Sequence, residues 1–166
     1  MKLYPIILLV ACTIGGLRAQ NTREQPPLNP VEVTLKSLSG TWYEISRLPN
    51  AVDSDLNDVS ITYYVSGDKK MKQILQGTTD KGKKIKLKSR LTYTGKGEIT
   101  GPMDGKYIIL AVGPNYEYFM MGTPDRKYLW IMSRKKTMEN NTYNVLVSKA
   151  DKMDYAILMM QMTAHK

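Results

Sequence analysis

The stretch G-T-W-Y-E-I at residues 40–45 decides the predicted fold, because it places a glycine two residues before a tryptophan. From Trp42 to Leu48 the side chains alternate between two faces, as in a half-buried strand. Gly40 allows a tight bend just before this strand, and the indole is well placed to fill one end of a barrel or sandwich. On its own, the stretch also fits an ordinary core tryptophan after an ordinary turn.

Short alternating runs follow from residue 59 onward, separated by turns at a spacing of about ten residues, which is typical of an antiparallel barrel or sandwich. The predicted strands after the first cover residues 59–66, 71–76, 83–93, a short run around Ile99, 107–112, 116–121 and 127–134. They succeed one another as hairpins, with no crossover helix. The polar loop 50–58 carries three apolar side chains that need cover, and a lid over an opening would supply it.

The strand at residues 83–93 has the clearest pattern, with lysines and Arg90 on one face and Ile85, Leu87 and Leu91 on the other. We interpret the basic face as solvated, and a specific anion site is the alternative. The chain has a formal net charge of +9, an excess that indicates anionic partners. Charge alone does not choose among nucleic acid, lipid headgroups and polysaccharide.

The period changes after the eighth strand. Within residues 138–152, four apolar residues recur at helical spacing, with Thr137 as a plausible N-cap; they are Tyr143, Leu146, Val147 and Ala150. Residues 155–162 return to a strand pattern. Because residues 157–160 are apolar on both faces, we expect this strand to be covered on both sides.

The N-terminal segment 1–19 has the charged start, apolar run and small residue of a signal peptide. Alternatively, it is a lipoprotein signal that ends before Cys12, since Leu9–Cys12 resembles a bacterial lipobox and Cys12 would then be lipidated. Residues 20–34 contain three prolines and predict a flexible lead, either a tether or a wrapped arm, which leaves 35–166 as one folded domain. We therefore expect a secreted or periplasmic protein, or one anchored to the outer membrane through Cys12.

Catalysis has little support in the sequence. The only histidine, His165, is next to last and is expected to be exposed, and the only cysteine lies in the signal segment. This leaves no Cys/His cluster for zinc or copper. Asp53, Asp55 and Asp58 share one loop but lack the glycine and glutamate of a known calcium loop. We expect no enzymatic activity, no cofactor and no metal.

A second motif, G-T-P-D-R-K-Y-L-W-I-M-S-R, covers residues 122–134. Together with residues 40–45, it resembles the lipocalin family in sequence, in order along the chain and in the distance between the two motifs. The chain is similar to bacterial outer-membrane lipocalins and their apolipoprotein D-like relatives over about residues 35–162. The resemblance implies an all-β fold: an eight-stranded antiparallel up-and-down barrel, or calyx, with one C-terminal α-helix packed outside and a ninth short strand. It also implies a structural signature of Gly40, Trp42 and Arg134, in which Arg134 lies over the Trp42 indole at the closed end.

An eight-stranded barrel can enclose one small ligand. The resemblance and the alternation together assign six residues to the cavity wall: Tyr107, Trp130, Met132, Ile85, Leu87 and Leu91. The expected function is binding and transport or storage of a small hydrophobic ligand, such as a fatty acid, a lysophospholipid or a similar amphiphile. An anionic membrane surface is a further candidate partner, and nucleic acid is not expected. The alternative is an envelope or cell-surface interaction protein that uses the basic face and has no lipid cargo.

Overall fold

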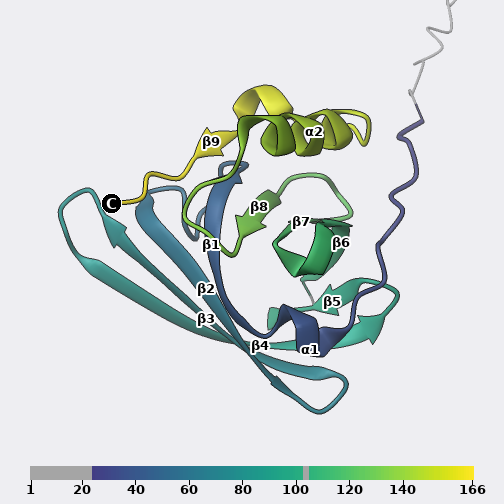
Figure 1. The fold of residues 1–166 in the computed structure, drawn as a ribbon, viewed down its shortest axis with the longest axis horizontal. Helices are drawn as coiled ribbons and strands as arrows, with labels where there is room; N and C mark the ends of the chain where they lie inside the picture. The colour runs from purple at the N-terminus through teal and green to yellow at the C-terminus, as the bar shows by residue number, and fades with distance from the viewer. Residues whose placement is uncertain (1–23, 103–104) are drawn as a thin grey trace, which may run out of the picture.

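The strands of the computed structural model, which describes residues 24–102 and 105–166, close into one barrel (Figure 1). They are β1 (Gly40–Arg47), β2 (Leu56–Ser66), β3 (Lys70–Thr79), β4 (Lys84–Gly95), β5 (Glu98–Thr100), β6 (Lys106–Val112), β7 (Tyr118–Gly122), β8 (Leu129–Ser133) and β9 (Gln161–Met162). Consecutive strands from β2 to β8 pair antiparallel, and β1 closes the ring by pairing with both β2 and β8. The predicted eight-stranded antiparallel barrel with a ninth strand outside it is confirmed.

Strand β1 changes partners along its length. Residues Gly40–Tyr43 pair with β2, whereas Tyr43–Arg47 pair with β8, and the register shifts between Glu44 and Ser46. In its second half β1 leaves β2, and the C-terminal tail lies between them: Thr163 N donates to Ile45 O at 3.0 Å, and Asp58 N donates to Ala164 O at 2.8 Å. This divergence makes room for buried polar side chains beside the barrel interior.

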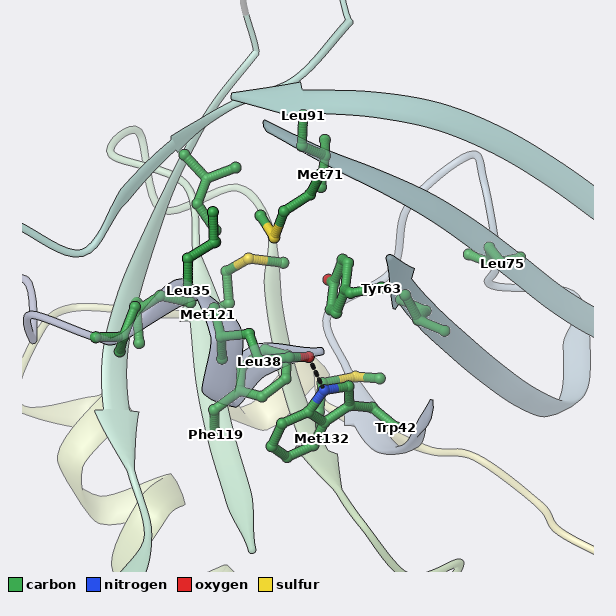
Figure 2. Packing of buried hydrophobic residues seen from close by; sticks show 14 of the residues in the cluster. Leu35, Leu38, Trp42, Tyr63, Met71, Leu75, Leu91, Phe119, Met121 and Met132 are labelled. Carbon is green, nitrogen blue, oxygen red and sulfur yellow. Dashed lines mark hydrogen bonds between the residues drawn. The ribbon is translucent and has the colours of Figure 1, made fainter. Parts of the chain in front are cut away.

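Two apolar clusters hold the fold together. One fills the barrel around Trp42 and includes Phe119, Met132 and Leu38 (Figure 2). The other lies between the barrel wall and helix α2 (Asn140–Asp151), which packs on the outside of the barrel (Figure 1). The part of the interior cluster around Trp42, with Leu38, Phe119 and Met132, closes one end of the barrel and is called the closed-end cluster. The outer cluster holds α2 against the barrel wall.

Helix α2 confirms the predicted helix but begins later. Its N-cap is Glu139 rather than Thr137, and no side-chain cap hydrogen bond forms there. Leu146 and Ala150 are buried against the barrel, in agreement with the helical spacing of the apolar residues. Within the described ranges, no helix is both long and apolar enough to cross a membrane.

The segment after α2 differs from the prediction. A single 3₁₀ turn, η3 (Ile157–Met159), precedes β9, which has only two residues and pairs with Ser46 and Arg47. The side chain of Leu158 is 96 % exposed and that of Met162 is 62 % exposed, so the expectation of a strand covered on both sides is wrong. Ile157 and Met160 are partly buried in the same cluster as α2, so the segment packs on one side only and leaves Leu158 and Met162 in solvent.

The proline-containing lead, from Glu24 to Thr34, forms no helix or strand, but it contacts the barrel as a wrapped arm before the short helix α1 (Leu35–Leu38) (Figure 1). Val31 N donates to Ile109 O at 2.8 Å, and the Tyr93 hydroxyl donates to Val33 O at 3.1 Å. Gly97 has φ +78°, and a Cβ at that position would collide with the Val31 carbonyl oxygen. The predicted signal segment 1–19 and Cys12 lie outside the described residues.

Candidate functional site

The closed end of the barrel is built around Trp42. Its side chain is fully buried, and its indole N–H donates to Leu38 O at 2.8 Å (Figure 2). The Phe119 ring packs edge-on against the indole, with centroids 4.6 Å apart. Such an edge-to-face arrangement is favourable for aromatic rings. The indole therefore acts as a plug rather than as part of an accessible site.

Arg134 lies over the other side of this plug. Its Cζ is 3.6 Å from the centroid of the Trp42 ring, and its guanidinium donates to the carbonyl oxygens of Thr41, Ser37 and Ser39 at 2.9–3.0 Å. Gly40 has φ +96°, and a Cβ there would lie 3.2 Å from Arg134 Nη1. Glycine is therefore favoured at position 40 for two reasons: the positive φ angle, and the short distance to the Arg134 guanidinium. The contacts join β8 to α1 and to the start of β1.

We predict that Arg134→Ala lowers the free energy of unfolding by about 1–2 kcal/mol, because it removes a cation–π contact and hydrogen bonds from a charged donor. Thermal or urea unfolding measures this change. Ligand affinity should be nearly unaffected, because the residue does not line the cavity. The matched control is Arg90→Ala, at an exposed position of β4. Loss of affinity as large as the loss of stability would contradict this assignment.

A cavity of about 300 Å³ lies inside the barrel, between the closed-end cluster and the loop that joins β1 to β2. Most of its lining is apolar or aromatic. The lining residues are Asn50, Ala51, Val52, Asp53, Ile61, Gln73, Leu75, Ser89, Leu91, Pro102, Tyr107, Met121, Tyr128 and Trp130. Four of them come from the β1–β2 loop, which therefore covers part of the cavity, and ligand sites of this volume are at the small end of the usual range.

The six residues assigned to the cavity wall from the sequence take different places. Tyr107, Trp130 and Leu91 line the cavity. Met132 is fully buried in the interior cluster near Trp42, and Ile85 is partly buried against the interior cluster, close to the β3–β4 turn, without lining the cavity. Leu87 is 43 % exposed and lies outside the lining. Met132 is thus covered by packed side chains around Trp42, whereas Ile85 and Leu87 lie on the part of β4 near the β3–β4 turn, outside the cavity lining.

Several lining residues were missed from the sequence. Ile61 on β2 and Leu75 on β3 belong to alternating runs, and this alternation could have identified them as inward-facing. Gln73 and Ser89, which are register partners on β3 and β4, are polar positions within otherwise apolar inner faces. The alternation could have placed these two residues on the inner face, but polar side chains at such positions are usually interpreted as solvent-exposed.

A buried polar cluster lies next to the cavity, centred on Arg47. Its Nη1 donates to Glu44 Oε1 at 2.6 Å and to Thr163 Oγ1 at 2.7 Å, and its Nη2 donates to Ser54 O at 2.6 Å. Arg47 Nε is 3.5 Å from Asp53 Oδ1. Arg47 is 3 % exposed and Glu44 is fully buried. One guanidinium therefore joins β1, the loop over the cavity and the C-terminal tail.

Asp53 connects this cluster to the cavity. Trp130 Nε1 donates to Asp53 Oδ2 at 3.1 Å, and the Asn50 amide donates to Asp53 Oδ1. Asp53 is 2 % exposed, so its carboxylate is held between the loop and the cavity wall rather than in solvent. In the part of the chain that the structure describes, no group of three or more His, Cys, Asp or Glu side chains is placed to hold a metal ion.

Glu44 is the most perturbed acid in the cluster. Burial, and secondly the nearby Asp53 carboxylate, raise the pKa of Glu44 from 4.5 to about 7, against the lowering effect of hydrogen bonds from Thr163 and Arg47. Glu44 Oε2 has no hydrogen-bond partner among the described residues. The expectation that His165 is exposed is wrong: its side chain is 7 % exposed, and its Nε2 lies 2.7 Å from Glu44 O.

A closed antiparallel barrel with a plugged end and an apolar internal cavity defines a ligand-binding barrel protein. Residues 33–165 match the family model described as a lipocalin-like domain. The chain belongs to the lipocalin family.

Curated relatives and solved structures agree with this assignment. Outer membrane lipoprotein Blc of Escherichia coli (strain K12) is 27 % identical over 95 % of this chain and 94 % of its own length. Temperature-induced lipocalin-1 of Arabidopsis thaliana is 31 % identical over 75 % of each chain. Insecticyanin from the tobacco hornworm Manduca sexta superposes with a TM-score of 0.68 and 20 % identity, covering 86 % of this chain and 87 % of that one. The protein is thus a lipocalin of the Blc type, and this membership supports small hydrophobic ligand binding in general.

Proposed function

We propose that the protein binds and transports or stores a small amphiphile, such as a fatty acid or a lysophospholipid, with its acyl chain in the barrel cavity. The observation that carries this proposal is the cavity of about 300 Å³, which is lined mainly by apolar and aromatic side chains beyond the Trp42 plug. Transfer of an acyl chain from water into such a cavity yields about 0.8 kcal/mol per CH₂ group. This gain must exceed the cost of ordering ligand and loop, so a chain of several carbons is needed. The proposed activity is binding rather than catalysis.

The proposed location is the secretory route or the periplasm, with attachment to an outer membrane through Cys12 as the alternative. Three features support it: the composition of residues 1–19, the lipobox-like Leu9–Cys12, and the similarity to outer membrane lipoproteins named Blc. Metabolic labelling with a palmitate analogue, compared between the full chain and a Cys12→Ser variant, distinguishes the two. Label lost in Cys12→Ser would support the anchor.

Ligand binding is expected to change the fluorescence of Trp130 and to leave that of Trp42 nearly unchanged. Trp130 lines the cavity between Tyr107 and Tyr128, with each ring centroid 6.0 Å from that of the indole, whereas Trp42 is fully buried in the plug. Titration of a saturated fatty acid and of a lysophospholipid into the wild type, Trp130→Phe and Trp42→Phe measures this directly. Trp130→Phe should abolish most of the change and Trp42→Phe should retain it.

The same titration tests the proposed function. Trp130→Ala should in addition weaken binding by about 1 kcal/mol, because it removes an aromatic wall. A response carried by Trp42 alone would contradict the assigned cavity. Absence of any response, together with no displacement of a fluorescent lipid probe, would reject lipid binding.

A second candidate function uses the outer face of β4. Lys84, Lys86, Lys88 and Arg90 are all exposed there, as expected from the alternation. Exposed cations in such a row attract anionic membrane surfaces, and salt screens the attraction. Binding to anionic vesicles at low salt, without displacement of any lipid probe from the cavity, would favour an interaction protein without lipid cargo.

A further inference from the structure

The described part of the cavity lining carries a single charged side chain, and that side chain is acidic. Among the described lining residues, Asp53 is the only acid, and there is no lysine, arginine or histidine. The basic residues of β4 point outward, since Lys88 and Arg90 are exposed whereas Ser89 and Leu91 line the cavity. Among the described residues, a ligand head group inside the barrel therefore meets one carboxylate and no side-chain cation.

The positive charge of Arg47 is shared between Asp53 and Glu44 and does not neutralise Asp53 only. Its guanidinium makes a close ion pair with Glu44, at 2.6 Å, and only a longer one with Asp53, at 3.5 Å. Two buried carboxylates thus share one cation, and the cation lies behind Asp53 because it is not part of the lining. Like charges brought together at such a site are unfavourable, whereas an opposite charge is favoured.

The neutral donors next to Asp53 are already used. Trp130 Nε1 and the Asn50 amide both donate to the Asp53 carboxylate, so they are not free to hold a ligand carboxylate. The remaining polar side chains in the lining are Gln73, Ser89 and the two tyrosines. These are neutral groups, and they accept hydrogen bonds as well as donate them.

We propose that Asp53 selects the ligand by its head group, so that the cavity prefers an amphiphile whose head donates hydrogen bonds and carries no negative charge, such as an alcohol or an ammonium, over a free carboxylate. This inference rests on the proposed function and narrows it. The acyl chain supplies the affinity through burial, and the head group beside Asp53 decides between chains of equal length.

The test compares three probes with the same saturated chain: a fatty amine, a fatty alcohol and a fatty acid. Each displaces a neutral fluorescent probe from the folded protein at mildly alkaline pH, below the critical micelle concentration of every probe. The amine and the alcohol should bind at least about tenfold more tightly than the acid, in keeping with the cost of like charges in a desolvated site. Equal or tighter binding of the acid would overturn the inference and leave lipid binding intact. Binding of none of the three would reject the proposed function, and this inference with it.

Asp53→Asn is the direct variant, and Asp55→Asn is its matched control. Both remove one carboxylate from the same loop, but Asp55 is exposed and does not line the cavity. In Asp53→Asn the preference for the amine over the acid should fall to within about threefold, whereas Asp55→Asn should keep the wild-type ratio. An unchanged ratio in a folded Asp53→Asn protein, as judged by circular dichroism, would overturn the inference.

A gain-of-function variant keeps the test decisive if Asp53→Asn does not fold. Gln73→Lys places a cation in the lining of the cavity, on strand β3, whereas Asp53 is in the β1–β2 loop. It should raise affinity for the acid and lower affinity for the amine, each by about tenfold. No change in either affinity would show that head-group charge is not read inside the cavity.

Discussion

Replacing Arg47 by alanine is expected to lower the free energy of unfolding by about 3–5 kcal/mol, which is the usual cost of removing one partner from a buried ion pair. Glu44 and Asp53 would remain buried without a cation. Ser54 O, Leu56 O and Thr163 Oγ1 would also lose a charged donor. The measurement is equilibrium unfolding in urea at neutral pH, with the midpoint and slope fitted separately.

The control for this variant is Arg90→Ala, which removes the same side chain from an exposed position on β4. Exposed substitutions of this kind change stability by about 0.5 kcal/mol or less. A second variant, Arg47→Lys, keeps the charge but cannot reproduce contacts to three different elements at once. We expect it to recover only part of the loss. A loss below about 1 kcal/mol in Arg47→Ala would mean that the cluster does not hold the loop to β1.

The stability of the protein is expected to fall as the pH rises from about 4.5 to about 7. In this window the unfolded chain has lost the Glu44 proton while the folded protein keeps it, because burial raises the folded-state pKa to about 7. Folding therefore binds a proton, and raising the pH works against it. Below the window both states are protonated, and above it both are ionised. The pKa difference corresponds to a loss of up to about 3 kcal/mol across the window.

Glu44→Gln isolates this contribution. The amide keeps an acceptor oxygen for Arg47 and Thr163 but cannot ionise, so its stability should be flat where that of the wild type falls. Unfolding experiments in a pH series give both slopes. The comparison rests on the slopes, because the amide also buries a new N–H group. Hydrogen bonding lowers the pKa of two other acids, the partly buried Asp58 and the exposed Asp125, which affects stability only below this window. Parallel slopes in the wild type and Glu44→Gln would contradict the assignment.

The barrel could be predicted because its signals are local and repeated. Alternation defined most strands within a few residues, and the turns between them favoured hairpins over crossovers. Trp42 is on β1, and Arg134 directly follows β8, which pairs antiparallel with β1, yet the two residues are about ninety positions apart in sequence. A motif pair could indicate that contact, whereas periodicity alone could not.

The cavity and the polar cluster could be predicted only in part. The alternation of β8 predicts that Trp130 and Met132 share a face, but it could not show that Trp130 lines the cavity while Met132 lies in the packed cluster around Trp42. In β1 the alternation predicts that Arg47 faces away from Glu44. The irregularity between Glu44 and Ser46 changes this, and both side chains are buried together. A bulge adds a residue without a periodic signal, so its consequence is not visible in the alternation.

The wrapped arm, residues 24–34, limits the distance between the cavity and a membrane to which the N-terminal segment is attached. The arm begins beside the β7–β8 connection, where Arg126 donates to Gln25 Oε1 at 2.9 Å and to Pro26 O. That connection also supplies Tyr128 to the cavity lining. If Cys12 carries the proposed lipid anchor, the chain from there to Glu24 spans at most ~40 Å when fully extended. The rim of the cavity would then stay within about one protein diameter of the bilayer, so a ligand could pass between them without release of the protein.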